Sequence, residues 1–329
     1  MTRPVKITGL GSYLPGQLPS AKLEASLGLP AGWSVRHSGV ETRHRATFES
    51  NGYMGARALE QALDDAGIPL AGLDMIISAA ATYDYPIPNR ASIIKNELRD
   101  GLACHIPAID IDTTCLSFLS AFEIAAALLD GRTYCRIGIV SSEISSCGLN
   151  PLDPETATLF GDGAAAVILE FNPGGASAMI RAGHQTFSEG VHETIFKGGG
   201  SRYPYKDCPY DPHVHSFTMN GRKLLRLAVR RLPEFMDWFF KDIPYALSDV
   251  DVVIPHQASK AGISLFRDIF SLKDRQLRQN LSIRGNCIAA SIPLLLYESV
   301  KSEQISRGDL CLLFGTSAGF TVGAALFVY

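Results

Sequence analysis

The chain has 329 residues, of which 46% are hydrophobic and 19% charged. This composition can bury a large core, which excludes a disordered chain, and the length fits two domains or one large one. With 30 Lys and Arg against 33 Asp and Glu, the formal net charge is −3, which gives no electrostatic reason to expect a nucleic acid or an anionic membrane as a partner.

The chain alternates between short apolar runs, which predict strands, and stretches with helical periodicity. Stretches with helical periodicity predict helices at 54–67, 117–131 and 221–242. Because strands alternate with helices, we expect an α/β fold with mostly parallel strand pairing. The predicted strands are, in chain order, 5–10, 74–81, 108–114, 136–142, 165–171, 251–257, 310–315 and 323–329.

The order of elements repeats within the chain, which predicts two similar halves, residues 1–172 and 173–329, that meet near a turn at 171–175. Corresponding turns of two packed halves lie close together, so Cys115 and Asn286, each at the start of a helix, are expected to be neighbours. The repeated segments are 56–82 with 221–258 and 112–143 with 283–317.

Residues 190–215 lack periodicity and are rich in Gly, Pro and Tyr, which predicts an inserted loop of the kind that often carries function. His213 and His215 alternate within it. Two His alone do not make a metal site, so we interpret them as part of a surface loop and expect no metal.

The seven Cys are irregularly spaced and form no C-x-x-C pair, which argues against a disulfide framework or a zinc site. No apolar run approaches the roughly 18 residues of a spanning helix. The start of the chain lacks the apolar region of a signal peptide. We therefore expect a cytoplasmic protein with reduced thiols.

Three glycine-containing motifs resemble, at first sight, a nucleophile elbow or a phosphate-binding loop. GTSAG at 315–319 matches the nucleophile elbow of hydrolases, but an apparent strand follows it and no His comes later, so a turn that presents backbone N–H groups is favoured. The segments at 160–168 and 9–16 lack the spacing of phosphate-binding loops and are interpreted as tight turns beside strands.

Cys115, His256 and Asn286 are the candidate catalytic residues. Cys115 lies between a strand and a helix, where the helix dipole and unpaired N–H groups favour a thiolate. Taken alone, each residue could instead have a purely structural role: Cys115 as a buried thiol, His256 as a hydrogen-bonded His and Asn286 as a helix cap. On matching positions of two halves, they form a Cys-His-Asn set suited to thioester chemistry.

Five motifs then identify a resemblance that runs nearly end to end. They resemble the markers of the thiolase superfamily, and most closely those of the beta-ketoacyl-acyl-carrier-protein synthase III family. The resemblance implies a five-layer αβαβα fold, a homodimer and decarboxylative Claisen condensation. The motifs are DTTCLSF, LFGDGAAAVILE, VVIPHQAS, GNCIAASIPLLL and GTSAGFTVGAAL.

The resemblance also assigns roles. Cys115 would take an acyl group from a thioester. His256 and Asn286 would hold the carbonyl of a malonyl unit and stabilise the enolate that forms as carbon dioxide leaves. The backbone N–H groups of Cys115 and Ala318 would form an oxyanion hole. No metal or organic cofactor is implied.

Several positions depart from the family pattern for coenzyme A and the carrier protein. Trp33 is present, but His37 stands where the family has Arg, with Arg36 one place early. Ser259 replaces an Asn. Ala261 stands where the family usually has Arg, and the Arg usually found before the FGDGA turn is replaced near Pro154. The loss of several guanidinium groups weakens the expected phosphate contacts and suggests a specialised pathway enzyme.

Other residues are expected to contact substrate or its carrier. Arg222 and Arg226 could supply a docking surface for an acyl carrier protein. Leu116 follows the nucleophile where small residues are usual, so it would reshape the acyl pocket. Tyr85 lies in a loop that, in this family, crosses the two-fold axis, and it would close the partner's acyl pocket.

The function expected from the sequence is condensation of a Cys-bound acyl group with a malonyl or beta-ketoacyl thioester, in fatty-acid or specialised lipid or polyketide biosynthesis. The acyl donor would be acyl-CoA or acyl-carrier-protein. One alternative is an acyltransferase of the same fold that forms an ester, an amide or a bond between two beta-keto units. Another is a non-catalytic partner subunit of a ketosynthase.

Overall fold

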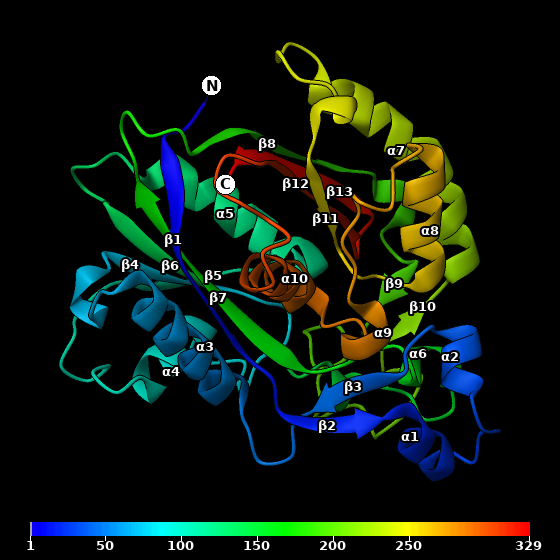
Figure 1. Ribbon diagram of the computed structural model, residues 1–329. Coiled ribbons are helices and arrows are strands. Elements are labelled where there is room, and N and C mark those ends of the chain that lie inside the picture. The colour runs from blue at the N-terminus through cyan, green and yellow to red at the C-terminus, as the bar shows by residue number, and fades with distance from the viewer. Residues whose placement is uncertain (1) are drawn as a thin grey trace.

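The computed structural model describes residues 2–329, and two β-sheets form its frame (Figure 1). The first sheet has the order β1 (Val5–Tyr13), β7 (Gly163–Phe171), β6 (Arg136–Glu143), β4 (Met75–Ala79) and β5 (Ala108–Ile111). The second has the order β11 (Val252–Pro255), β12 (Leu310–Ser317), β13 (Thr321–Val328) and β8 (Ala178–Thr186).

Helices separate and cover the two sheets. Between them lie α5 (Ser117–Leu128) and α10 (Ser291–Lys301), which share one apolar core with strands of both sheets (Figure 1). The outer face of the first sheet carries α3 (Asn51–Ala66) and α4 (Arg90–Glu97), and that of the second carries α7 (Gly221–Phe240) and α8 (Lys260–Ile269). The predicted αβαβα layering is therefore confirmed.

Close packing of α3 on β1 explains the glycines near the N-terminus. A Cβ on Gly9 would lie 2.1 Å from the carbonyl oxygen of Ala62, and one on Gly11 would lie 2.1 Å from that of Ala58. Both glycines are inside β1, so the predicted tight turn at 9–16 is wrong for its first residues. They are glycines because the helix backbone leaves no room for a side chain.

Strand pairing is mixed, and the predicted mostly parallel pairing is wrong. β4 pairs parallel with β5 and β6, and β11 pairs parallel with β12. The β1–β7, β6–β7, β12–β13 and β13–β8 pairs are antiparallel. β12 and β13 are joined by only residues 318–320, which is too short for a parallel crossover.

β8 was not predicted, because Arg181, His184 and Gln185 interrupt its apolar pattern. The two sheets nevertheless repeat one strand order. β8-β13-β12-β11 matches β1-β7-β6-β4, and Leu277 bridges to Val253 of β11 where β5 pairs with β4. The division at residue 172 stays a prediction.

Smaller elements complete the chain. β2 (Gly16–Pro19) and β3 (Thr42–Arg45) form a ribbon at one end of the molecule beside the short helices (Figure 1). β9 (Thr194–Ile195) and β10 (Thr218–Met219) close the base of the predicted inserted loop. The short helices are α1 (Ser20–Ser26), α2 (Trp33–His37), α6 (Pro154–Ala157) and α9 (Leu281–Arg284). Among residues 2–329, no helix combines the length and apolarity needed to cross a bilayer.

Candidate active site

A sharp turn presents Cys115 at the start of α5. Thr114 has a φ of 53°, in the left-handed region, and its N–H donates to Oδ1 of Asp112 at 2.9 Å. Ser117 Oγ accepts from the N–H of Thr113 at 3.0 Å and donates to the carbonyl of Thr114 at 2.7 Å. These bonds hold a conformation that a β-branched residue rarely adopts.

The second half repeats this turn at the start of α10. Ile288 has a φ of 47°, and its N–H donates to Oδ1 of Asn286 at 2.8 Å. Ser291 Oγ accepts from the N–H of Cys287 at 3.0 Å. By this pattern Asn286 is the counterpart of Asp112, and Ala289 that of Cys115. The expectation that Cys115 and Asn286 hold matching positions is therefore wrong, although the two turns do contact each other.

Gly315 of β12 allows the segment that carries His256 to pack against the turn that carries Cys115. A Cβ at Gly315 would lie 2.8 Å from Cβ of His256 and 2.9 Å from Cδ2 of Leu116, so only Gly fits there. The GTSAG motif is thus the end of β12 and the turn into β13, as expected. Ala318 in this turn directs its N–H at the Cys115 sulfur.

Burial dominates the chemistry of Cys115. It raises the pKa of the thiol to about 12, and the nearby Glu143 adds to the rise. The N–H groups of Ala318 and of Cys115 itself lower the pKa without overcoming burial. The predicted thiolate is therefore wrong for the free enzyme. The two N–H groups of the predicted oxyanion hole do face this sulfur, while their role in catalysis stays a prediction.

His256 follows β11 and is buried. Burial lowers its pKa to about 4, so the imidazole is neutral at neutral pH. Its backbone N–H donates to the carbonyl of Phe314 at 2.7 Å, which fixes the chain, and within residues 2–329 no group bonds its Nδ1. A neutral ring can donate one N–H to a substrate oxygen without transferring a charge.

Asn286 is oriented by its neighbours. Its Oδ1 is occupied by the N–H of Ile288, and its Nδ2 donates to the carbonyl of Ala258 at 3.2 Å. One Nδ2 hydrogen remains for a ligand. Because Ala258 lies two residues after His256, the donors of His256 and Asn286 belong to one site. The structure thus brings the segments that carry all three predicted catalytic residues together.

Comparison with known proteins agrees with this geometry. A family model described as 3-oxoacyl-[acyl-carrier-protein (ACP)] synthase III matches residues 109–186, and its C-terminal counterpart matches 241–329. The beta-ketoacyl-[acyl-carrier-protein] synthase III of Coxiella burnetii is 32% identical over 98% of both chains. The chain belongs to the beta-ketoacyl-[acyl-carrier-protein] synthase III family. It is therefore an acyltransferase of that type.

Solved structures agree on the fold. The 3-oxoacyl-[acyl-carrier-protein] synthase III of Aquifex aeolicus superposes with a TM-score of 0.88 at 27% identity, covering 100% of both chains. The priming beta-ketosynthase of the R1128 polyketide pathway gives 0.87 at 22% identity, covering 99% of this chain and 97% of that one. At that identity the second likeness shows the fold alone.

Glu143, at the end of β6, is a site residue that the sequence analysis missed. Its carboxylate accepts from the N–H groups of Ala81 at 2.8 Å and Thr82 at 2.9 Å, and lies 3.4 Å from the N–H of Ala289. Burial raises its pKa to about 7. The available signal was a single acidic residue at the end of an otherwise apolar strand.

The residues expected to bind a thioester carrier lie on surface elements. Trp33 and His37 stack on α2 with ring centroids 4.1 Å apart, and Arg36 is exposed beside them. Ser259 caps α8 by accepting from the N–H of Gly262 at 3.0 Å. A Cβ on Gly39 would lie 3.0 Å from the Lys260 side chain, so α2 and the start of α8 are adjacent.

The other predicted contacts are spread more widely. Arg222 and Arg226 are exposed one turn apart on α7, and neither pairs with a carboxylate within residues 2–329. Leu116 is fully buried in the core between the sheets. Tyr85 is 60% exposed, and Ile87 in the same loop is 87% exposed. Contact of these residues with substrate stays a prediction.

The two His of the inserted loop lie in different surroundings. His215 stacks between Tyr205 and Tyr210, with centroids 5.4 and 5.7 Å away, and His213 is exposed. No group of three or more His, Cys, Asp or Glu within residues 2–329 is arranged to hold a metal.

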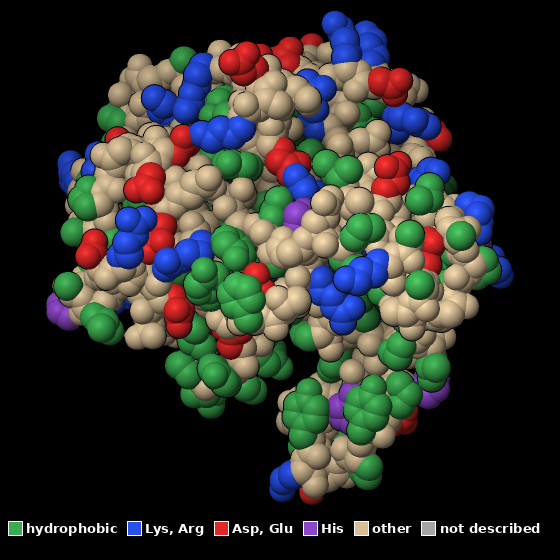
Figure 2. All heavy atoms as spheres, turned by 60° about the horizontal axis from the view of Figure 1, so that its bottom comes forward, with side chains coloured by type: hydrophobic (Ala, Val, Ile, Leu, Met, Phe, Trp, Pro, Cys, Tyr) green, Lys and Arg blue, Asp and Glu red, His purple; other side chains and the backbone are tan. Residues whose placement is uncertain are grey.

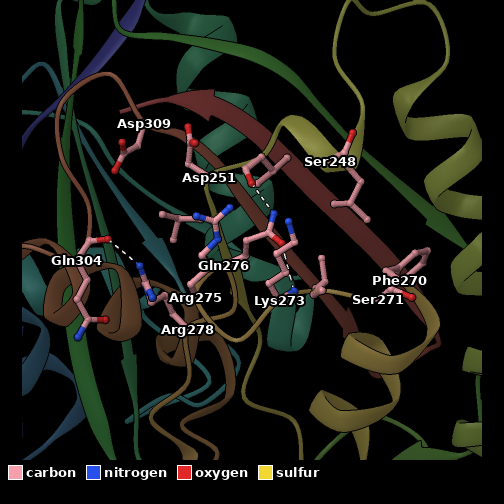
Figure 3. A pocket seen from close by; sticks show the side chains of 14 residues that line it. Ser248, Asp251, Phe270, Ser271, Lys273, Arg275, Gln276, Arg278, Gln304 and Asp309 are labelled. Atoms are coloured by element: carbon pink, nitrogen blue, oxygen red, sulfur yellow. Dashed lines mark hydrogen bonds between the residues drawn. The ribbon is translucent and has the colours of Figure 1, made fainter.

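A surface cavity of about 480 Å³ lies elsewhere on the second sheet (Figure 3). Its polar lining includes Asp251, Lys273, Arg275, Arg278 and Asp309. Asp251 and Asp309 precede β11 and β12, whereas the catalytic groups follow these strands. The cavity is therefore at the opposite end of the sheet from the family's catalytic centre.

Glu143 should give the protein a measurable pH dependence. Its pKa rises from 4.5 to about 7 on folding, so the unfolded chain loses its proton first and stability falls as pH rises across that window. Relative to Glu143→Gln, the wild type should lose up to about 3 kcal/mol of unfolding free energy between pH 4.5 and 8.

Urea unfolding at intervals of half a pH unit measures the effect. Glu170→Gln, in the partly exposed pair with Arg136, is the control and should parallel the wild type. The buried His256 shifts stability in the opposite sense, because its pKa falls to about 4 on folding, but it contributes equally to every variant. Parallel curves for the wild type and Glu143→Gln would contradict the assignment.

Proposed function

We propose that this enzyme carries out decarboxylative Claisen condensation, joining an acyl group on Cys115 to a malonyl or beta-ketoacyl thioester. One observation carries the proposal. The Ala318 N–H is directed at the Cys115 sulfur, and the segments that carry the neutral His256 and Asn286, whose Nδ2 keeps one hydrogen, pack next to the Cys115 turn. Fixed, neutral donors of this kind suit the stabilisation of oxygen anions.

In the first half-reaction the Cys115 sulfur attacks the carbonyl carbon of an acyl thioester. The new Sγ–C bond forms, the bond to the donor sulfur breaks, and the thiol proton ends on the departing thiol. The N–H groups of Cys115 and Ala318 stabilise the intermediate oxyanion. Because the Cys115 pKa is about 12 and that of His256 about 4, a resting thiolate–imidazolium pair is strongly disfavoured.

In the second half-reaction, His256 and Asn286 hold the carbonyl oxygen of the malonyl thioester. The bond to the carboxylate carbon breaks, carbon dioxide leaves, and the electron pair becomes an enolate held by the two donors. The enolate carbon attacks the acyl carbonyl, a C–C bond forms, and the Cys115 sulfur departs and recovers a proton. A beta-ketoacyl acceptor has no carboxylate to lose, so its enolate would form by loss of the proton between its two carbonyl groups to water, with the same donors on the enolate oxygen.

The surface residues suggest how the carrier is bound. Arg222 and Arg226 on α7 offer unpaired charge to the acidic surface of an acyl carrier protein, and Trp33, Arg36 and His37 on α2 with Ser259 on α8 would flank the thioester arm. Fewer guanidinium groups than usual in this family favour a specialised lipid or polyketide pathway over the initiation of fatty-acid synthesis.

A homodimer is part of this proposal. Hydrophobic side chains gather along the lower edge of one face, on two projections separated by a gap (Figure 2). Tyr83, Tyr85 and Ile87 lie in one loop and expose 49%, 60% and 87% of their surface. Exposed apolar side chains in a cluster favour burial against a second copy. There Tyr85 would close the acyl pocket of the partner.

The nucleophile assignment has a direct test. Incubation with an acyl-CoA or an acyl-carrier-protein should add one acyl mass to the wild type, as measured on the intact protein, and none to Cys115→Ala. Cys147→Ala, which removes an exposed thiol, should acylate normally. An adduct on Cys115→Ala would sink the assignment, and a wild type that never acylates would favour the non-catalytic subunit.

The division between the half-reactions is the second expectation. His256→Ala and Asn286→Ala should each lose condensation by on the order of 10²–10³-fold while still acylating Cys115, because each removes one donor to the enolate. Product formation from malonyl thioester and acylation are measured on the same samples. Wild-type condensation by Asn286→Ala would refute its role, and an ester or amide product would favour the alternative acyltransferase.

Tyr85 should limit the length of the acyl group. Tyr85→Ala opens the proposed end of the pocket, so preference in a series of donors should shift toward longer or bulkier chains. Ile87→Ala, in the same loop, tests whether the neighbouring exposed side chain does this instead. Sedimentation of the same samples gives the oligomeric state. An unchanged length profile, or a fully active monomer, would contradict the proposal.

A further inference from the structure

The helix α9 (Leu281–Arg284) connects the two donors that face the enolate. It spans only four residues, which is too short to be stable through its own hydrogen bonds. Its first residues are held by the neighbour of His256, and its last residue leads through Gly285 to Asn286. The place of α9 therefore depends on the side chains around it.

Gln257, directly after His256, holds the start of α9. Its side chain is fully buried. Oε1 accepts from the N–H groups of Asn280 and Leu281, both at 3.1 Å, and Nε2 donates to the carbonyl of Pro255 at 2.9 Å. The two bonds to Oε1 thus link the His256 segment to the start of the helix that precedes Asn286, and the Nε2 bond ties the amide to its own segment.

Glu298 on α10 holds both ends of α9. Oε2 accepts from Nδ2 of Asn280 at 2.9 Å, and Oε1 accepts from Nε of Arg284 at 2.7 Å. The two charged side chains of the pair are only 23% and 20% exposed, so solvent screens the pair less than a surface ion pair.

The first half of the chain completes the contact. Arg284 Nη1 lies 2.8 Å from Nε2 of His44 on β3, and His44 Nδ1 lies 2.6 Å from the carbonyl of Pro15. A carbonyl can only accept, which assigns the proton to Nδ1 and leaves Nε2 to accept from Arg284. Burial lowers the pKa of His44, which keeps the ring in this neutral form.

A displacement of α9 would also displace Asn286. Gly285 has a φ of 69°, and a Cβ there would lie 2.6 Å from the carbonyl oxygen of Leu159. The N–H of Asn286 donates to the same carbonyl at 2.9 Å, and its own carbonyl accepts from Gly161 at 3.2 Å. The link from α9 to Asn286 therefore has little freedom to absorb a displacement.

We propose that Gln257 and Glu298 are positioning residues for the condensation half-reaction. Through α9 they set the separation and orientation of the His256 and Asn286 donors, and Arg284 and His44 anchor this arrangement to the first half. The inference rests on the proposed function, because it assigns these residues to the step in which the enolate forms. Neither Gln257 nor Glu298 touches the reacting atoms.

Two variants test the proposal. Glu298→Gln keeps the shape of the side chain but replaces one carboxylate oxygen by an NH₂ group. The side chain can then no longer accept from both Asn280 and Arg284 through separate oxygens. Gln257→Leu keeps the volume and removes all three hydrogen bonds. Each should lower kcat for decarboxylation of malonyl thioester by about tenfold or more with KM nearly unchanged, since misplaced donors lose transition-state stabilisation. Acylation of Cys115 should stay within twofold of wild type.

Glu170→Gln is the control, because Glu170 pairs with Arg136 at 2.8 Å near the end of β7 and is 32% exposed, against 23% for Glu298. It should leave both half-reactions unchanged. Thermal unfolding of all variants shows whether they are folded, and if Gln257→Leu fails to fold, the isosteric Glu298→Gln carries the test.

Wild-type decarboxylation by a folded Glu298→Gln would overturn the positioning role. An equal loss of acylation and decarboxylation would do so as well, because a general structural defect affects both steps. A wild-type enzyme that acylates Cys115 but neither decarboxylates malonyl thioester nor condenses would instead overturn the proposed function, and the positioning role with it.

Discussion

The candidate catalytic centre depends on the contact between two left-handed turns, one at the start of each helix between the sheets. Thr114 and Ile288 each adopt a positive φ, held by an Asp or Asn side chain two residues before and a Ser three residues after. Because the helices share one core, the two turns contact each other, and the turn that carries Cys115 also packs on β12. This contact places Cys115 beside the segment that carries Asn286.

Desolvation then determines the charge state of the site. It raises the pKa of Cys115 and of Glu143 and lowers that of His256, so the thiol and the imidazole are both neutral at neutral pH. In such an environment fixed N–H donors interact strongly with an oxygen anion. The site therefore suits a reaction in which negative charge appears on oxygen only during the chemical step.

Much of this arrangement could be predicted from the sequence. Apolar runs and helical periodicity located eight main strands and three long helices, because burial of one face imposes a period on the chain. The repeated order of elements predicted two similar halves. The motifs around Cys115, His256 and Asn286 identified the family and the three candidate catalytic residues, since each motif combines a reactive side chain with the small residues that its turn requires.

Other features were decided only by the tertiary structure. The polar residues of β8 concealed its strand pattern, and the three-residue connection between β12 and β13 forced antiparallel pairing where alternation predicted parallel strands. The thiolate expected from the helix start of Cys115 was wrong, because burial and Glu143 outweigh the local N–H groups. Glu143, Gln257 and Glu298 gave little signal, since their partners are distant in sequence. Local patterns determined which residues form each element and turn. Only packing determined the desolvation, and with it the charge, of the groups that meet there.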